Sequence, residues 1–205
     1  CISSAASDVY KRQSLSGTID AARQAAEIAG QSDNVTIIDS ELTDRAEGFQ
    51  VLAAAKDAQA GKSMAEIIDH VKKIRSTQKL EMMVVNLQNL IKGGRLGALS
   101  GRIATMLNIR IALQMPQGKL IVAKKGRGKK FTRAFDERVL KEIADNKEHI
   151  KEVGISYVDT PELMEELAEK IRAINPAINV LVAETSPIIA THAGNGAYAI
   201  LYYVE

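Results

Sequence analysis

Several residue types are scarce in this chain of 205 residues, and each scarcity narrows the class of protein. The only cysteine is Cys1, which excludes a disulfide within the chain and favours a reducing, cytoplasmic location. Tryptophan is missing and aromatic residues make up 4% of the sequence, so few side chains are available to stack on nucleic-acid bases. No apolar run approaches the roughly 18 to 20 residues of a membrane-spanning helix.

Charge of one sign and known catalytic motifs are also scarce. The formal net charge is only +2, so any basic site must be a local patch. The sequence has no H-E-x-x-H, no Walker glycine-lysine loop and no G-x-S-x-G elbow. Its three histidines, His70, His149 and His192, lie far apart in the sequence. We therefore expect no metal, no cofactor and no catalytic residue. What is present, 46% hydrophobic and 25% charged residues, describes a globular chain of one or two domains.

The first thirteen residues differ from the rest. The run from Ser3 to Gln13 resembles the direct translation of a transposase adaptor used in sequencing libraries, and a natural polar arm is the alternative. We expect residues 1–13 to be an adaptor-derived segment with no part in the fold. The natural sequence would then begin near Ser14, inside a longer protein whose preceding part supplies parallel strands.

Helices and a strand alternate over residues 14–78, which predicts the remainder of an N-terminal α/β domain. The pattern indicates helices over Ile19–Ala29 and Thr43–Ala60 and a short buried strand over Val35–Ile38. The run Ser63-Met64-Ala65-Glu66 is a capping box that begins a further helix.

The pattern changes near residue 79, and residues 79–205 predict a C-terminal α/β domain. Strands over Ile109–Met115 and Lys119–Lys124 flank Pro116-Gln117-Gly118, which is a hairpin signal. Because a purely parallel sheet would contain no hairpin, we expect a mixed or antiparallel sheet here. The domain boundary is placed at about residue 78.

The C-terminal stretch carries the strongest candidate site. Strands are expected over Ile188–Ala190 and Ala197–Val204, joined by a loop from Thr191 to Gly196. Hydroxyl, imidazole and backbone amide groups of this loop could converge on a small anion. An ordinary loop histidine is the alternative for His192. An enzyme would need Ser16 or Thr18 activated by His192, an interpretation that we do not favour.

A basic run extends over residues 124–133, with six lysines and arginines and no acid. A solvated face is one explanation. The other is an anionic partner, because a helix is expected to begin near Lys129 and cations in a first turn oppose the helix dipole. Phosphate, an acidic protein or nucleic acid would serve.

Six short motifs together resemble the successive signatures of the DegV family of bacterial fatty-acid-binding proteins. They are SLSGT (14–18), IIDS (37–40), KGGRLG (92–97), QGKL (117–120), KKGRGKK (124–130) and THAGNGA (191–197). The resemblance implies a two-domain α/β protein that holds one long-chain fatty acid with its carboxylate at the domain junction. It also implies that the protein presents this acid to a separate ATP-using fatty acid kinase, which makes acyl-phosphate.

The resemblance also assigns residues to roles. The head group would be bound by His192, Thr191, Gly194, Gly196, Arg95, Ser16 and Thr18. The acyl-chain pocket would include Ile103, Met106, Leu107 and Ile189, and a partner would dock on Arg127, Lys129 and Lys130. Val85 and Asn89 stand where the family usually has an acidic and an aromatic residue. The alternatives are a general lipid carrier without a kinase partner, or a module that binds nucleic acid or another anionic partner through residues 124–133.

Overall fold

The computed structural model describes residues 17–93 and 108–205. The chain divides into two compact units. The helical unit comprises the residues up to Thr77 together with Gln117–Lys119, and the sheet unit comprises Gln78–Pro116 and Leu120–Glu205. In the described ranges, no helix is both long and apolar enough to cross a membrane.

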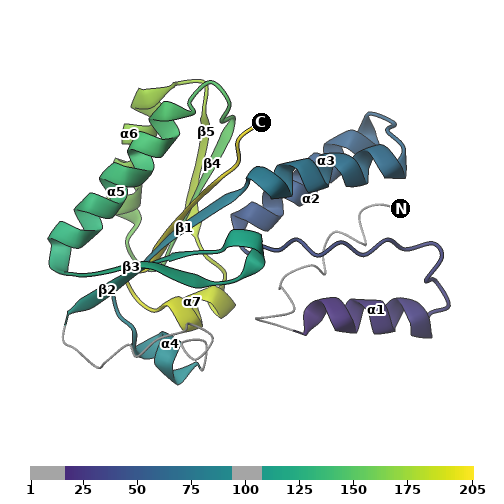
Figure 1. Ribbon diagram of the computed structural model, residues 1–205, viewed down its shortest axis with the longest axis horizontal. Helices are drawn as coiled ribbons and strands as arrows, with labels where there is room; N and C mark the ends of the chain where they lie inside the picture. The colour runs from purple at the N-terminus through teal and green to yellow at the C-terminus, as the bar shows by residue number, and fades with distance from the viewer. Residues whose placement is uncertain (1–16, 94–107) are drawn as a thin grey trace. The chain divides into compact units, whose positions relative to one another are not determined.

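The helical unit contains helices α1, α2 and α3, which span Thr18–Ile28, Arg45–Gln59 and Met64–Thr77. Helices α2 and α3 pack against each other as a hairpin (Figure 1). Phe49 of α2 and Ile67, Val71 and Ile74 of α3 are buried. The predicted capping box is confirmed, since the Ser63 amide donates to Glu66 Oε2 at 2.8 Å and the Glu66 amide donates to Ser63 Oγ at 3.4 Å.

The strand predicted over Val35–Ile38 is wrong. The segment is extended, but it forms no strand with any residue that the structure describes. A strand needs a hydrogen-bonded neighbour, which a short apolar run does not guarantee. Ordered contacts begin just after it, where Arg75 Nη1 donates to the Asp39 carbonyl at 2.6 Å and Gln50 Nε2 donates to the Ser40 carbonyl at 2.9 Å.

The sheet unit is built on six strands in the order β3-β2-β1-β6-β4-β5. In chain order they span Lys79–Val84, Ile109–Gln114, Ile121–Arg127, Glu152–Tyr157, Asn179–Glu184 and Tyr198–Tyr202. β4 and β5 are parallel, and every other neighbouring pair is antiparallel. The predicted α/β fold with a mixed sheet and a β2–β3 hairpin is therefore confirmed. The parallel-sheet character of the N-terminal domain stays a prediction.

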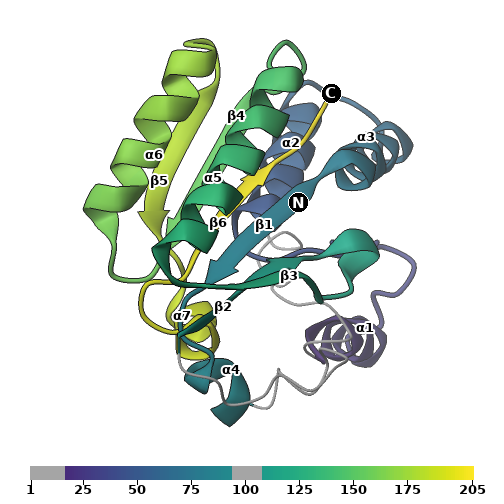
Figure 2. The same cartoon turned by 60° about the vertical axis from the view of Figure 1, so that its left-hand side comes forward.

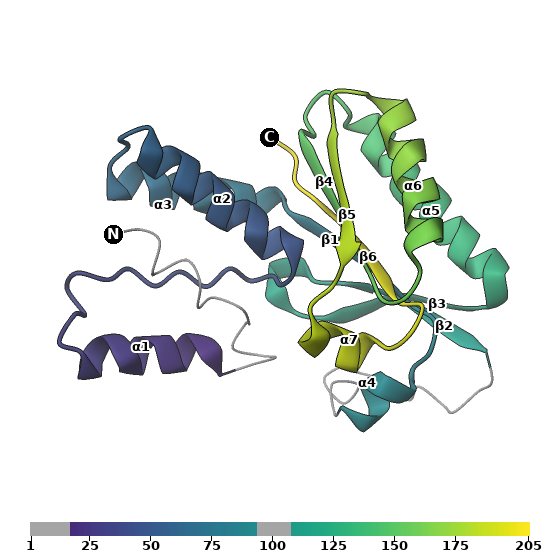
Figure 3. The ribbon, with the colours of Figure 1, turned by 180° about the vertical axis from the view of Figure 1, so that it is seen from behind.

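Helices α5 (Gly128–Asp145) and α6 (Pro161–Ile174) cover one face of this sheet (Figure 2). Side chains alternate across β1, so that Met83 packs in the core under α5 and α6, whereas Val84 faces the opposite side. There Val84 packs with Ile111, Leu113 and Leu90. Leu90 belongs to the short helix α4 (Gln88–Lys92), which lies beside helix α7 (Pro187–Ala193), as Figure 3 shows.

An ion pair between a buried acid and a partly exposed arginine ties α5 to the sheet. Glu81 of β1 is only 2% exposed, and its carboxylate accepts hydrogen bonds from Arg138 of α5 and from Gln114 of β2. The Arg138 guanidinium also lies 5.3 Å from the centre of the Phe135 ring. Because each oxygen of Glu81 has a donor, the buried charge is compensated.

Glu47, in the first turn of α2, is a second buried acid. It is 4% exposed, and burial raises its pKa from 4.5 to about 8. The Ser40 hydroxyl lowers this pKa and the charge of Asp39 raises it, both to a smaller extent. Glu47 is therefore neutral in the folded helical unit at pH 7, whereas it is ionised when unfolded.

We predict that Glu47→Gln removes a pH dependence of the stability of the helical unit. Because burial raises the pKa of Glu47, the helical unit is most stable below about pH 4.5, where the carboxyl group is protonated in both the folded and the unfolded state. This stability is lost as the pH rises to about 8. One pKa unit corresponds to about 1.4 kcal/mol, so the gain from the neutral amide at pH 9 should reach a few kcal/mol. Amide hydrogen exchange of α2 at pH 5 and pH 9 would measure it. Glu148→Gln on an exposed turn is the control, and parallel pH profiles for wild type and Glu47→Gln would contradict the prediction.

Candidate functional site

His192 lies in the last turn of helix α7, and not in a loop as predicted. Ser186 precedes Pro187 at the first helical position, where its fixed φ and missing amide favour a helix. The strand predicted over Ile188–Ala190 is therefore wrong, because a short apolar run does not by itself distinguish strand from helix. The Gly194 amide donates to the Ala190 carbonyl at 2.9 Å, and the helix ends there with Gly194 at φ 77°.

The turn after α7 is anchored on the end of β4. The Gly196 amide donates to the Val158 carbonyl at 3.0 Å, and the Val158 amide donates to the Ala197 carbonyl at 2.9 Å. The Asn195 side chain donates to Asp159 Oδ2 at 2.9 Å. These bonds continue the β4–β6 pairing into the turn, so the position of His192 is tied to the centre of the sheet.

The predicted donors of this turn have partners within the protein. Thr191 Oγ1 donates to the Pro187 carbonyl at 2.8 Å, and the amides of Gly194 and Gly196 donate to carbonyl groups as described above. These donors are thus used within the protein in this structure, and a role of the three residues in binding a head group stays a prediction. His192 itself is half-buried, and its Nδ1 atom is shielded from solvent.

Helix α4 contacts α7 next to the histidine. Asn89 Nδ2 donates to the Thr191 carbonyl at 3.0 Å. A Cβ atom placed on Gly93 would lie 2.4 Å from His192 Nδ1, and one placed on Gly194 would lie 3.1 Å from Asn89 Cγ. A Cβ on Gly196 would lie 2.7 Å from Val85 Cγ2. Val85 and Asn89 therefore pack directly on the glycines of the candidate site.

The structure describes two further predicted site residues, each within its own unit. Thr18 opens α1 in the helical unit, and Ile189 is a half-buried residue of α7. Five predicted residues lie outside the described ranges, namely Ser16, Arg95, Ile103, Met106 and Leu107. Their assignment to the head group or the acyl-chain pocket stays a prediction.

The basic run occupies a sheet edge and a helix start. Lys124, Lys125 and Arg127 belong to β3, which extends three residues beyond the prediction, and Lys129 and Lys130 lie in the first turn of α5. All five side chains are exposed. Since β3 is the edge strand of the sheet, the run forms an accessible basic surface, which we call the β3–α5 basic surface.

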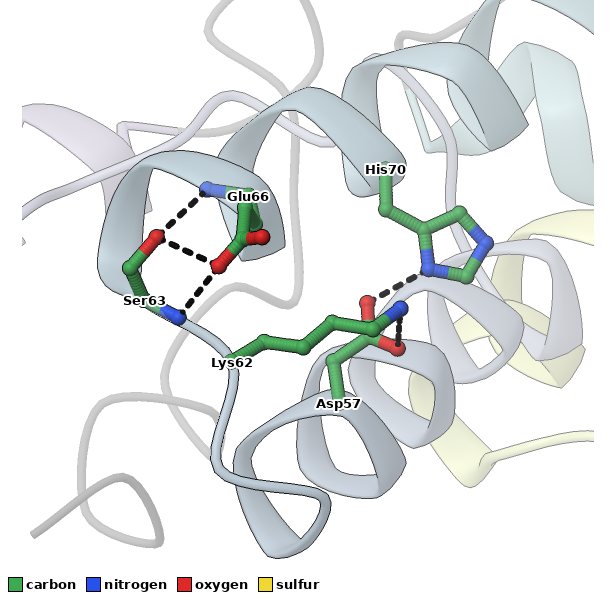
Figure 4. Close-up of polar contacts among 5 residues, drawn as sticks. All are labelled: Asp57, Lys62, Ser63, Glu66 and His70. Atoms are coloured by element: carbon green, nitrogen blue, oxygen red, sulfur yellow. Dashed lines mark hydrogen bonds and ion pairs between the residues drawn. The ribbon is translucent and has the colours of Figure 1, made fainter.

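A polar cluster that the sequence did not reveal joins α2 to α3 (Figure 4). Asp57 Oδ1 accepts from Lys62 Nζ at 2.7 Å, and Asp57 Oδ2 lies 2.5 Å from His70 Nδ1. Hydrogen bonds from Lys62 and His70 hold the pKa of Asp57 below its usual range. The cluster spans the Gly61 turn, so it stabilises the helical hairpin. In the described ranges no three acidic, histidine or cysteine side chains could hold a metal ion.

A hydrogen-bonded pair that the sequence also did not reveal lies between α5 and β6. The Tyr198 hydroxyl donates to Asp136 Oδ1, and the Tyr198 ring meets Phe135 edge-on at 6.0 Å between centroids. Burial raises the pKa of Asp136 and that of Tyr198. The Tyr198 hydroxyl therefore stays protonated and neutral over the ordinary pH range. The pair acts as a structural contact within the core.

These features define an α/β protein with a mixed sheet and a candidate anion-binding histidine at one end of it. The chain belongs to the DegV family, because the family model "Uncharacterised protein, DegV family" matches residues 12–205. A DegV domain-containing protein of Streptococcus pyogenes serotype M3 is 41% identical over 199 residues, which cover 96% of this chain and 69% of that protein. The matched region begins two residues before the predicted natural start at Ser14.

Two solved structures have the same fold. DegV, a fatty acid binding protein from Bacillus subtilis, aligns with a TM-score of 0.82 and 26% identity over 95% of this chain and 68% of that one. The Fatty Acid Kinase (Fak) B3 protein of Streptococcus pneumoniae, loaded with linoleic acid, aligns with a TM-score of 0.78 and 22% identity over 95% of this chain and 69% of that one. The second likeness shows the fold alone.

We predict that the packing of Val85 on Gly196 limits substitution at the turn. Gly196→Ala should destabilise the protein by about 1 to 2 kcal/mol from its positive φ of 76°, and further through the contact with Val85. Val85→Ala should relieve only the second effect. The double variant should therefore lose less stability than the sum of the single variants, by about 0.5 kcal/mol or more in urea unfolding. Additive losses would contradict the contact.

Proposed function

We propose that this protein binds one long-chain fatty acid, with the carboxylate beside His192. The proposal rests on membership of the DegV family and on the Bacillus subtilis relative, which is a fatty acid binding protein. The observation that carries it is the half-buried imidazole of His192, held at the junction of α4, α7 and the end of the sheet. A carboxylate withdrawn from water needs a hydrogen-bond donor of this kind.

The head group is bound by His192 together with Arg95, Ser16 and Thr18 in this proposal. Because the Thr191 hydroxyl and the two glycine amides donate within the protein, Thr191, Gly194 and Gly196 contribute the shape of the site. Gly194 and Gly196 have positive φ values of 77° and 76°, and they admit the Asn89 and Val85 side chains close to the backbone.

Apolar residues near His192 support a lipid ligand. Helices α4 and α7 each expose a large apolar side chain, Ile91 and Ile188, both 44% exposed. Ile189 is half-buried on α7. We assign Ile103, Met106 and Leu107 to the same acyl-chain pocket on the family resemblance. Burial of each methylene contributes about 0.8 kcal/mol, so an acid of roughly fourteen to eighteen carbons would owe most of its affinity to the tail.

We further propose that the protein is not itself an enzyme and presents the bound acid to a separate fatty acid kinase, which forms acyl-phosphate. The β3–α5 basic surface is the proposed docking site, with Arg127, Lys129 and Lys130 as its central residues. Its support is electrostatic, since Lys129 and Lys130 stand in the first turn of α5 against the helix dipole. An acidic surface on the kinase would compensate this charge and speed association.

We predict that His192→Ala lowers the rate of fatty acid phosphorylation more than it lowers fatty acid affinity. The apolar tail supplies most of the binding free energy, whereas one head-group hydrogen bond contributes about 1 to 3 kcal/mol. A carboxylate displaced by about 1 Å can react on the order of a hundredfold more slowly. Oleate titration and acyl-phosphate formation with the kinase would measure the two effects.

The matched control for this experiment is His149→Ala, which removes an exposed histidine from the same unit. It should leave both affinity and phosphorylation unchanged. If His192→Ala binds oleate as the wild type does, and the bound oleate is phosphorylated at the wild-type rate, then His192 is an ordinary helix residue and the proposed head-group contact is wrong.

We predict that reversing the charge of Arg127, Lys129 and Lys130 to Glu weakens kinase-dependent phosphorylation while oleate binding persists. The control triple, Lys119, Lys147 and Lys151 to Glu, makes the same change of net charge at exposed positions outside the basic surface. Phosphorylation at several kinase concentrations would reveal the loss as a raised half-saturating concentration. Equal loss of lipid binding would refute a docking role, and salt-dependent retention of wild type on RNA or DNA would favour the nucleic-acid alternative.

A further inference from the structure

Helices α4 and α7 interlock through two glycines, one at the C-terminal end of each helix. Gly93 ends α4, and the space where its Cβ would lie is filled by the His192 ring of α7. Gly194 ends α7, and the corresponding space is occupied by the side chain of Asn89 from α4. Each helix therefore inserts one polar side chain against the end of the other.

Position 93 requires glycine because space is lacking there, and not because of its backbone conformation. Gly93 has an ordinary φ of −76°, which any residue adopts. A Cβ there would lie 2.4 Å from His192 Nδ1 and 3.0 Å from His192 Cε1. These distances are shorter than van der Waals contact, so any larger residue at position 93 must displace the imidazole.

Asn89 fixes the backbone that carries the histidine. The side-chain Nδ2 atom of Asn89 donates to the Thr191 carbonyl at 3.0 Å, and this carbonyl immediately precedes His192. A carbonyl in the last turn of a helix lacks a partner within its own helix, so the Asn89 side chain takes the place of the next turn. The last turn of α7 is thereby held to α4.

We propose that Asn89 and Gly93 are positioning residues, which together set the orientation of the His192 imidazole. The Nδ1–Cε1 edge of the ring lies against Gly93, and Nδ1 is buried there. The importance of this orientation for a fatty acid head group rests on the proposed function, whereas the orientation itself does not.

The experiment compares Gly93→Ala and Asn89→Ala with wild type by NMR of protein labelled with 15N-histidine, without fatty acid. Both variants should shift the ring resonances and the titration midpoint of His192, while the resonances of His149 stay unchanged. Gly48→Ala is the matched glycine control, because a Cβ at Gly48 has nothing within 4 Å. It should leave His192 unchanged.

The second measurement is phosphorylation of bound oleate. Gly93→Ala should lower the rate by on the order of tenfold or more, and Gly93→Ala with His192→Ala should be no slower than His192→Ala alone. Unchanged His192 resonances in both variants, or fully additive losses of rate, would overturn the proposal. Asn89→Ala decides the question if Gly93→Ala fails to fold. Shifted resonances in a protein that binds no oleate would refute the proposed function and leave the positioning role standing.

Discussion

The sheet unit depends on the pairing of β6 with its two neighbours. All five residues of β6 are buried, and the strand is antiparallel to both β1 and β4. Since β6 lies between them, in the described part of the chain it is the strand that joins the two halves of the sheet by hydrogen bonding. The turn that precedes β6 continues the pairing with β4 at Val158. The position of helix α7, which carries His192, is therefore set by the central strand.

Polar groups inside the core add specificity to this arrangement. Glu81 reaches Arg138 and Gln114, and Tyr198 reaches Asp136, so that α5 is held to β1 and β6 by directed bonds as well as by apolar packing. Removing one partner of such a pair leaves a buried polar group without compensation, which is costly. These contacts therefore favour one placement of α5 on the sheet over others of similar apolar burial.

The sequence predicted the features that depend on local pattern and failed where long-range contacts decide. The β2–β3 hairpin and the Ser63–Glu66 capping box follow from nearby residues and are confirmed. The segment before Asp39 and the run after Pro187 are short and apolar. Neither the spacing of their apolar residues nor their composition indicates whether a neighbouring strand is present. The burial of Glu47 and Glu81 likewise depends on residues far apart in the chain. The same is true of the contact between His192 and Gly93. The sequence singled out His192 as a candidate, because glycines and polar residues interrupt two apolar runs there, and its role in binding a head group stays a prediction.

The central claim is that this DegV family protein carries a fatty acid, and native mass spectrometry of the purified protein, followed by organic extraction, tests it most directly. The account predicts one bound acid of roughly fourteen to eighteen carbons per chain, since the tail dominates the binding free energy. A protein that yields no acid on extraction and binds neither added oleate nor palmitate would contradict the account.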